Sequence, residues 1–318
     1  MIWLPVIIGA TIKKEQYRVD MTYKIAIASG KGGTGKTTVA VNLFSTLRNA
    51  GKPVTLIDTD VEEPNANLFI KGEKVDEEPV NMMIPEINTD VCTFCGKCVD
   101  ACAFSAIMMV KSVKHIQVLP DMCHSCGACS YVCPEEGAIT EYPRKLGDIT
   151  QFRMNSGKEA MTYEGRMQVG EALAVPVIKD AKKKIIPDFI NLIDAPPGTS
   201  CPAMEALHDA DYTILVAEPT PFGLNDLKII LSTVRKLKRR VGVVINKADA
   251  GNDELKNYLQ QENVDVLASI PFSKAIAASY AEGRSIIDDF PDVKKHFEEL
   301  WRKIELKLKE TDATDNNR

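Results

Sequence analysis

Eight of the nine cysteines in this 318-residue chain lie between positions 92 and 133, in two runs of one pattern. Each run has the spacing C-x2-C-x2-C-x3-C, and the second run follows the first at an offset of 31 residues. An Asp-x-Cys triplet opens each run, and an Ala-Ile pair follows each one. Such an internal duplication predicts a self-contained module, at residues 85–144, rather than a loop.

Cysteines in a cytoplasmic chain are metal ligands or catalytic thiols more often than disulfide partners. The spacing resembles that of bacterial ferredoxins with two [4Fe-4S] clusters, in which three thiolates of one run and the fourth of the other hold each cluster. Zinc is the competing interpretation, because thiolates suit both metals. The resemblance implies that cluster I is held by Cys92, Cys95, Cys98 and Cys133, and cluster II by Cys123, Cys126, Cys129 and Cys102.

Strand-like apolar runs alternate with helical patterns on both sides of this module. Continuous apolar strands are buried on both faces, as in a parallel sheet covered by helices. The pattern predicts an α/β fold with a doubly wound, mostly parallel sheet, built from residues 21–84 and 145–310 and interrupted by a small α+β domain of bacterial ferredoxin type. The expected strands are 24–28, 54–57, 189–193, 212–216, 241–245 and 264–270, and the clearest helices are 36–50 and 224–237.

The loop after the first expected strand has a phosphate-binding sequence. Residues 30–37 (G-K-G-G-T-G-K-T) fit G-x-x-x-x-G-K-[ST] in the required strand–loop–helix context. The glycines let backbone N–H groups converge on phosphates, and the helix adds the positive end of its dipole. ATP and Mg²⁺ are therefore the predicted ligands, with Lys36 at the β and γ phosphates and Thr37 on Mg²⁺. The nucleotide-lining residues are expected to be Gly32, Gly33, Thr34, Gly35, Lys36, Thr37 and Thr38.

A second lysine, Lys31, makes this loop resemble that of the deviant Walker A ATPases, which include MinD, ParA, Mrp-type cluster carriers and the nitrogenase iron protein. The resemblance implies a homodimer in the ATP state, in which Lys31 of one subunit contacts the nucleotide of the other. It also implies that Asp58 belongs to the Mg²⁺ shell and that Asp60 orients or deprotonates the attacking water. Asp194 would be the Walker B aspartate, and Gly198 would sense the γ-phosphate.

Later motifs extend the resemblance to the base of the nucleotide. Asn246 ends a strand where the family has an adenine contact, and Pro271 and Phe272 match the segment that flanks the base. The run N-K-A-D at 246–249 also occurs in GTPases, so guanine is the alternative base. The likeness is closest to MinD-superfamily ATPases with an inserted ferredoxin domain, and it covers nearly all of residues 22–84 and 145–305.

The ninth cysteine, Cys201, lies seven residues after Asp194. We expect a buried or half-buried structural cysteine. The alternative is a thiol near a dimer axis, because the nitrogenase iron protein has a cluster ligand at the same offset. The Cys-x-x-Cys pair of Mrp-type carriers has no counterpart here.

The ends of the chain and its charge limit its location and partners. Residues 1–12 are apolar but too short to span a bilayer, so residues 1–20 are predicted to be a dispensable extension. Apolar residues at helical spacing within 297–308 predict a last helix packed on the core, with membrane docking as the alternative, and a disordered tail at 311–318. A net charge of −5 argues against nucleic acid as a partner. We expect a cytoplasmic protein without a membrane anchor.

Three functions remain open at this point. The first is an ATP-hydrolysing iron–sulfur protein, slow and stimulated by a partner, that couples dimerisation to electron transfer with a redox protein. The second is a carrier or assembly ATPase for iron–sulfur clusters or another metallocofactor, and the weakest is a MinD-like positioning ATPase with structural clusters. Eight cysteines favour the first function, because an assembly scaffold is expected to hold a labile cluster on fewer ligands.

Overall fold

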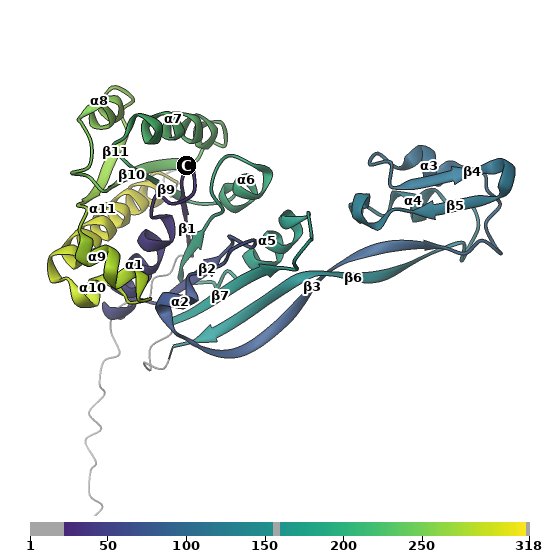
Figure 1. The fold of residues 1–318 in the computed structure, drawn as a ribbon, viewed down its shortest axis with the longest axis horizontal. Coiled ribbons are helices and arrows are strands. Elements are labelled where there is room, and N and C mark those ends of the chain that lie inside the picture. Colours follow the sequence, from purple (N-terminus) through teal and green to yellow (C-terminus); the bar gives the residue numbers. More distant parts are fainter. Residues whose placement is uncertain (1–21, 155–159, 316–318) are drawn as a thin grey trace, which may run out of the picture.

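The computed structural model describes residues 22–154 and 160–315, and residues 1–20, predicted to be a dispensable extension, lie outside this part. A nine-stranded sheet has the strand order β11-β10-β9-β1-β8-β2-β7-β6-β3 (Figure 1). The strands from β11 to β7 are parallel, whereas β6 and β3 are antiparallel to their neighbours, so the prediction of a mostly parallel sheet is confirmed. The strands are β1 (Tyr23–Ala28), β2 (Val54–Asp58), β3 (Glu73–Ile87), β6 (Ile139–Arg153), β7 (Ala160–Met167), β8 (Ile190–Asp194), β9 (Tyr212–Ala217), β10 (Arg240–Asn246) and β11 (Asp265–Ile270).

Helices cover both faces of the sheet because successive strand residues point to opposite sides. Ile25 and Ile27 of β1 pack with α1, α10 and α11, whereas Ala26 and Ala28 pack with α5, α6, α7 and α8. The six predicted strands lie within one residue of their expected ends, and the doubly wound arrangement is confirmed. The helices are α1 (Lys36–Asn49), α2 (Asn67–Ile70), α5 (Ala174–Lys182), α6 (Cys201–Leu207), α7 (Pro221–Lys236), α8 (Glu254–Gln261), α9 (Lys274–Ala281), α10 (Ile286–Asp289) and α11 (Pro291–Asp315).

Two helices differ from their predicted limits. α7 begins three residues before the expected position because Thr220 caps it, with the Thr220 hydroxyl accepting a hydrogen bond from the Gly223 N–H at 3.0 Å. α11 buries Phe297, Leu300 and Trp301, which confirms the packed last helix. It continues to Asp315, so the disordered tail predicted from residue 311 is wrong for residues 311–315. Within the described part of the chain, no helix is long and apolar enough to span a membrane.

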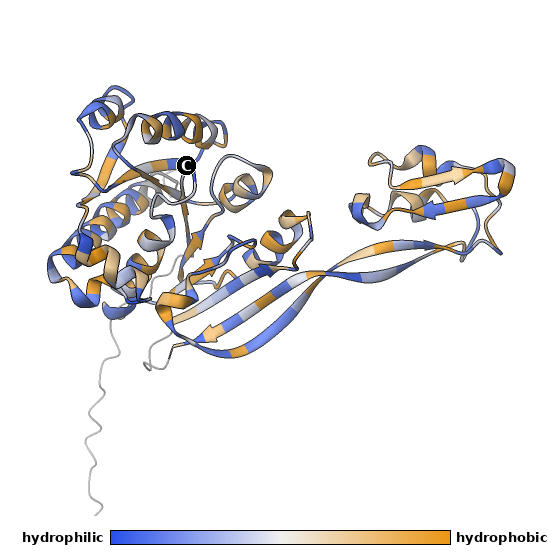
Figure 2. Ribbon diagram, viewed as in Figure 1, coloured by the Kyte–Doolittle hydropathy of each residue, from blue (hydrophilic) through white to orange (hydrophobic). Residues whose placement is uncertain are grey.

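The long antiparallel pair β3–β6 is the main feature that the sequence did not predict. The two strands pair from Glu73 opposite Arg153 to Ile87 opposite Ile139, and they form an arm that leaves the body of the sheet (Figure 1). The domain boundaries predicted at 84/85 and 144/145 are wrong, because both fall inside these strands. The first half of β3 is mostly hydrophilic (Figure 2) and exposed, whereas residues of its second half alternate between buried and exposed. The arm therefore joins the two parts of the molecule through continuous strands.

The cysteine-rich module, residues 88–138, lies at the far end of the arm (Figure 1). Its two halves have matching local structures at the 31-residue offset of the cysteines. α3 (Lys97–Ala101) corresponds to α4 (Ala128–Val132), and the residue after each helix is the last cysteine of a run. Between the two halves lies a hairpin of β4 (Ile107–Val110) and β5 (His115–Val118) with short 3-10 turns after each strand.

Candidate functional site

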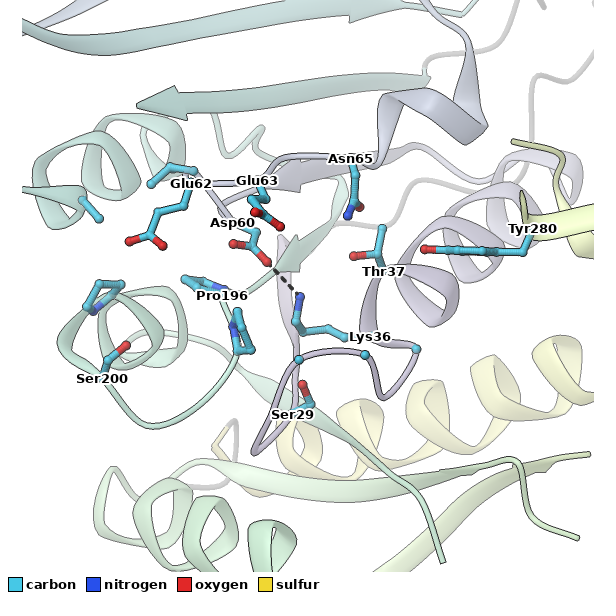
Figure 3. Close-up of a pocket in the computed structure, with 17 residues that line it drawn as sticks. Ser29, Lys36, Thr37, Asp60, Glu62, Glu63, Asn65, Pro196, Ser200 and Tyr280 are labelled. Carbon is cyan, nitrogen blue, oxygen red and sulfur yellow. Dashed lines mark hydrogen bonds and ion pairs between the residues drawn. The ribbon is translucent and has the colours of Figure 1, made fainter. Parts of the chain in front are cut away.

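The loop between β1 and α1 forms one wall of a cavity of about 360 Å³ at the carboxyl ends of the parallel strands (Figure 3). α1 begins at Lys36, directly after Gly35, whose φ of 93° is in the left-handed region. A Cβ atom at Gly35 would lie 2.3 Å from Nδ2 of Asn246, and this amide donates a hydrogen bond to the carbonyl oxygen of Thr34 at 2.8 Å. Both the backbone angle and the close approach therefore require glycine at this position.

Lys36 points from the loop toward the carboxylate of Asp60 (Figure 3) and also lies close to that of Asp194. Its Nζ atom lies 3.5 Å from Oδ2 of Asp60 and 3.4 Å from Oδ1 of Asp194. Burial alone would lower the pKa of Lys36, but the carboxylates of Asp194, Asp60 and Asp58 outweigh burial and raise this pKa. Oδ2 of Asp194 is buried and has no hydrogen-bond partner among the residues that the structure describes. The site thus contains a charged lysine and a buried carboxylate oxygen that is free to accept another ligand.

Asp58 is fully buried at the end of β2, and both its oxygens are occupied. Oδ1 accepts from the N–H of Asp60 at 3.1 Å, and Oδ2 accepts from the N–H groups of Asn65 and Ala66 at 3.0 Å each. Burial, followed by the charge of Asp194, raises the pKa of Asp58 to about 8. Burial also raises the pKa of Asp60. Asp58 therefore fixes the loop between β2 and α2.

Two other residues from the predicted phosphate site have partners within the chain. Lys31 lies 4.0 Å from Glu218, whose other oxygen lies 2.6 Å from Lys247. The N–H of Gly198 donates to the carbonyl oxygen of Ser29 at 2.9 Å, so this amide is not directed at the cavity. Thr37 is buried and lines the cavity. The remaining predicted loop residues that line it are Gly32, Gly33, Gly35 and Lys36.

A second, mainly apolar cavity of about 280 Å³ lies beside the first. Residues predicted for base and phosphate binding line it together, namely Gly33, Gly35, Thr38, Asn246, Pro271 and Phe272. Tyr280 of α9 lines both cavities. Tyr280 and Thr38 both line the apolar cavity, and the ring centroid of Tyr280 lies 4.4 Å from that of Phe69 in α2. The two cavities thus form one site with room for phosphates at one end and a flat ring at the other.

Sequence reasoning missed Tyr280, Glu62 and Glu63, which all line the larger cavity (Figure 3). Glu62 and Glu63 follow Asp60 closely in the chain, so their proximity to this motif was an available signal. Tyr280 lies far from every motif in sequence, and only the packing of α9 places it in the site.

The eight clustered cysteines line two further cavities. One is lined by Cys92, Cys95, Cys98 and Cys133, and the other by Cys102, Cys123, Cys126 and Cys129. These are the two sets expected from the sequence, each with three thiols from one run and one from the other. The N–H of Phe94 donates to Sγ of Cys92, and the N–H of Ser125 donates to Sγ of Cys123, both at 3.4 Å.

All nine cysteines are free. No group of three or more His, Cys, Asp or Glu side chains in residues 22–154 and 160–315 is arranged to hold a metal ion. Cys201 is exposed at the first position of α6. The expectation of a buried or half-buried structural cysteine at this position is therefore wrong.

An arginine of the arm joins the module to the body of the protein. One nitrogen of Arg144, in β6, lies 2.8 Å from Oδ1 of Asp121 and 2.8 Å from Oε2 of Glu171. Asp121 is two residues before Cys123. Glu171 accepts hydrogen bonds from the N–H groups of the two residues before α5, and Ala174, the first residue of α5, lines the phosphate-sized cavity.

Comparisons with known proteins agree with this geometry. The profile of the CobQ/CobB/MinD/ParA nucleotide binding domain matches residues 25–286. The uncharacterized protein MJ0578 of Methanocaldococcus jannaschii is 32% identical over 296 residues, which cover 88% of this chain and 96% of that protein. The iron-sulfur cluster carrier protein of Pyrococcus horikoshii is 26% identical over 310 residues, which cover 91% of this chain and 87% of that protein.

The fold is also similar to a solved structure, the septum site-determining protein MinD of Pyrococcus horikoshii complexed with Mg-ADP. The TM-score is 0.53 at 24% sequence identity, and the match covers 89% of this chain and 96% of that one. The family profile spans most of the chain, including the phosphate loop and the strands around it. This protein therefore belongs to the CobQ/CobB/MinD/ParA nucleotide-binding family.

Proposed function

We propose that this protein is an ATPase that couples the state of its bound nucleotide to two [4Fe-4S] clusters, which the cysteine module holds and uses in electron transfer. The observation that carries the proposal is the ion-pair relay in which Arg144 contacts Asp121, beside the cysteines, and Glu171, beside the phosphate-sized cavity. Family membership supports nucleotide binding and hydrolysis. Family membership does not extend to the coupling, the clusters or the electron transfer, which are the parts that we propose.

ATP would place its phosphates in the larger cavity and its adenine in the apolar one, against Asn246, Pro271 and Phe272. Lys36 would turn from its two carboxylates to the β and γ phosphates, and Thr37 would ligate Mg²⁺. In this arrangement the loop N–H groups and the start of α1 supply further positive potential.

Hydrolysis and dimerisation would use residues that now have partners within the chain. Asp60 would orient or deprotonate the attacking water, while Asp58 and Asp194 would hold the Mg²⁺ shell, for which the free buried oxygen of Asp194 is suited. The N–H of Gly198 would leave Ser29 for the γ-phosphate. Lys31 would leave Glu218 to reach the nucleotide of a second subunit, so a homodimer would form only with ATP.

The cysteine residues fit two iron–sulfur clusters in number and in the way the two runs divide between the two cavities. Each cavity is lined by four thiols, and each run of cysteines contributes three thiols to one cavity and one to the other, as in two-cluster ferredoxins. N–H groups that donate to Cys92 and Cys123 would stabilise the thiolate charge. When bound, each cluster would accept or release one electron, and Cys95 and Cys126, which are exposed, would be the sides nearest to a partner.

Two connections would transmit the nucleotide state to the module. The first is the relay through Glu171, Arg144 and Asp121. The second is the chain itself, because Asp58 holds the N–H groups of Asn65 and Ala66 at the start of α2, and α2 leads directly into β3. Movement of the loop after Asp60 on loss of the γ-phosphate would therefore act on the base of the arm.

The free energies involved indicate that the strands of the arm contribute more to the coupling than the ion pair does. Asp121 is 88% exposed in its side chain, so its pair with Arg144 contributes at most about 1 kcal/mol. Coupling between two ligand sites is commonly about 1–3 kcal/mol. Loss of the ion pair should therefore weaken the coupling without abolishing it.

The test of the clusters is anaerobic purification followed by iron and sulfide analysis. Two [4Fe-4S] clusters require about eight iron and about eight sulfide per chain, with a visible chromophore. Stoichiometric zinc without a chromophore would refute the assignment, because thiolates bind that metal equally well.

A second candidate function is delivery of clusters to other proteins. The observation that favours it is the likeness to proteins named iron-sulfur cluster carrier protein, among them the one from Pyrococcus horikoshii. Incubation of the loaded protein with a cluster-free ferredoxin distinguishes the two. ATP-dependent transfer of iron and sulfide to the acceptor supports the carrier, whereas full retention of the clusters over many ATP turnovers supports electron transfer.

A further inference from the structure

The two cysteine-lined cavities share one backbone but differ in charge. In both halves a residue with left-handed backbone follows the first cysteine by two positions, Phe94 with φ 56° and Ser125 with φ 53°. Each N–H of this pair donates to the first cysteine sulfur at the same distance, 3.4 Å. Because the duplication makes these contacts equal, they do not distinguish the two sites.

At the cavity of Cys92, Cys95, Cys98 and Cys133, the additional charge is a lysine. Nζ of Lys111 donates to the carbonyl oxygen of Cys95 at 3.2 Å, and a Cβ atom on Gly96 would lie 3.3 Å from this Nζ atom. The equivalent glycine of the second half, Gly127, has no atom within 4 Å of such a Cβ. The lysine therefore covers the loop of one cysteine set and has no counterpart at the other.

At the cavity of Cys102, Cys123, Cys126 and Cys129, the charge is a carboxylate. Glu141 lines this cavity, and its Oε1 atom accepts a hydrogen bond from the hydroxyl of Ser130 at 3.0 Å. Counted from the Ala-Ile pairs, the position that matches Glu141 in the first half is Met109, which lines the other cavity. At this equivalent position the first half thus has the uncharged thioether of Met109, and the second half has the carboxylate of Glu141.

Other groups near the cavities do not reverse this difference. Lys97 and Glu135 both line the first cavity, and their charges oppose each other. The second cavity has one further N–H donor, from Ala106 to Sγ of Cys102 at 3.2 Å, which favours the reduced state there. A unit charge acts over a longer distance than one amide dipole, so Lys111 and Glu141 determine the sign of the difference.

We propose that Lys111 and Glu141 give the two cysteine sets unequal reduction potentials, with the higher potential at the set of Cys92, Cys95, Cys98 and Cys133. This inference rests on the proposed function, in which each set holds one cluster. A nearby cation stabilises the reduced state, which is more negative by one charge, and a nearby carboxylate destabilises it. One electron from a low-potential ferredoxin-type carrier would therefore settle at the lysine side.

The position of the lysine-side cavity in the module determines the direction in which the difference in reduction potential would move electrons. The lysine-side cavity is lined by Ile87 of β3, whereas the other cavity is lined by Met83 and Pro85, which come earlier on this outward-running strand. The lysine side is therefore farther from the nucleotide domain. Electrons would collect at the outer end of the module, where a partner can approach without touching the body of the protein.

The experiment is a reductive titration of the anaerobically purified full chain with dithionite and redox mediators, followed by electron paramagnetic resonance. Wild-type protein should show two one-electron steps. Lys111→Gln should lower only the higher reduction potential, and Glu141→Gln should raise only the lower one. Each variant should therefore bring the two reduction potentials closer together. Lys114→Gln is the matched control, because it removes the same charge from the turn of the same hairpin. It should change both reduction potentials less than Lys111→Gln changes the higher one.

The outcomes separate this inference from the proposed function. If the wild-type chain carries no iron and sulfide, both are wrong. If the clusters are present in all variants at equal iron content, but Lys111→Gln moves the lower step or neither step, only the inference is overturned.

Discussion

The nucleotide domain and the cysteine module achieve a folded structure in different ways. Two buried clusters of 31 apolar residues each lie on either face of its sheet, and all their members except Ala106 and Cys123 of the module belong to the domain and the arm. The module's own cluster has four buried residues, Cys98, Ile107, Ile116 and Cys129, and two of these are cysteines from the candidate cluster sites. Roughly 50 residues is close to the size below which a chain needs metals or disulfides to fold.

This difference indicates that the molecule combines a domain with a large apolar core and a module whose order, under the proposed function, depends on its ligands. Burial of apolar surface provides the stability of the domain. The cysteines of the described module form no disulfides, and under the proposed function metal–thiolate bonds would supply the additional order. Changes made in one region should therefore leave the other folded.

Removal of one buried thiolate from each set should have the largest effect. In Cys98→Ser combined with Cys129→Ser, each cluster loses a ligand and the module loses half of its buried cluster. We expect loss of iron and rapid proteolysis within residues 88–138, while ATP binding measured by calorimetry stays within about twofold of wild type. A module that still resists protease in this variant would show that apolar packing alone maintains it.

A change in the phosphate loop should have the converse effect. Lys36→Ala removes a charged contact to the phosphates worth about 3 kcal/mol, so the Kd for ATP should rise about a hundredfold or more. Iron content should not change. If this variant also loses its clusters, the two regions are not independent of each other.

Lys31→Ala is the matched control, because it removes the same charge from the same loop. It should bind ATP as wild type does but fail to dimerise or hydrolyse ATP, as seen by light scattering and phosphate release. Normal hydrolysis by this variant would contradict the proposed role of Lys31 in a dimer.

Removal of the ion-pair relay should have a smaller effect that concerns only the connection between the regions. Arg144→Gln should leave iron content and ATP affinity unchanged. Since the lost pair contributes at most about 1 kcal/mol, the effect of ATP on the module should weaken about fivefold or less. Arg153→Gln, which changes the other arginine of β6 at the base of the arm, is the control. If ATP affects the module equally in the two variants, Arg144 has no specific role in the connection between the regions.

A pH dependence of stability should be confined to the nucleotide domain. The pKa of Asp58 is raised from 3.8 to about 8, so the folded state holds a proton that the unfolded state releases in this interval. The free energy of unfolding of the nucleotide-free protein should therefore fall as pH rises from about 4 to about 8. Urea unfolding at several pH values measures this slope, which should be flatter in Asp58→Asn because the amide does not ionise.

The features that the sequence predicted are those specified by short-range spacing. The phosphate loop, the two cysteine sets and the apolar strands each need only a few neighbouring residues to be recognised. The arm was missed because the first half of β3 is charged and exposed, which conceals the alternation that begins at Val80. Tyr280, Arg144 and Glu171 were missed for another reason, since tertiary packing alone brings these distant residues to the site and its connections.

The most direct measurement is a reductive titration of the loaded protein with and without saturating Mg·ATP, in wild type and in Lys36→Ala. Coupling through the arm predicts that ATP moves the titration curve of the clusters in wild type and leaves that of Lys36→Ala unchanged. Superimposable wild-type curves, at an ATP concentration shown by calorimetry to fill the site, would contradict coupling between the nucleotide domain and the cysteine module.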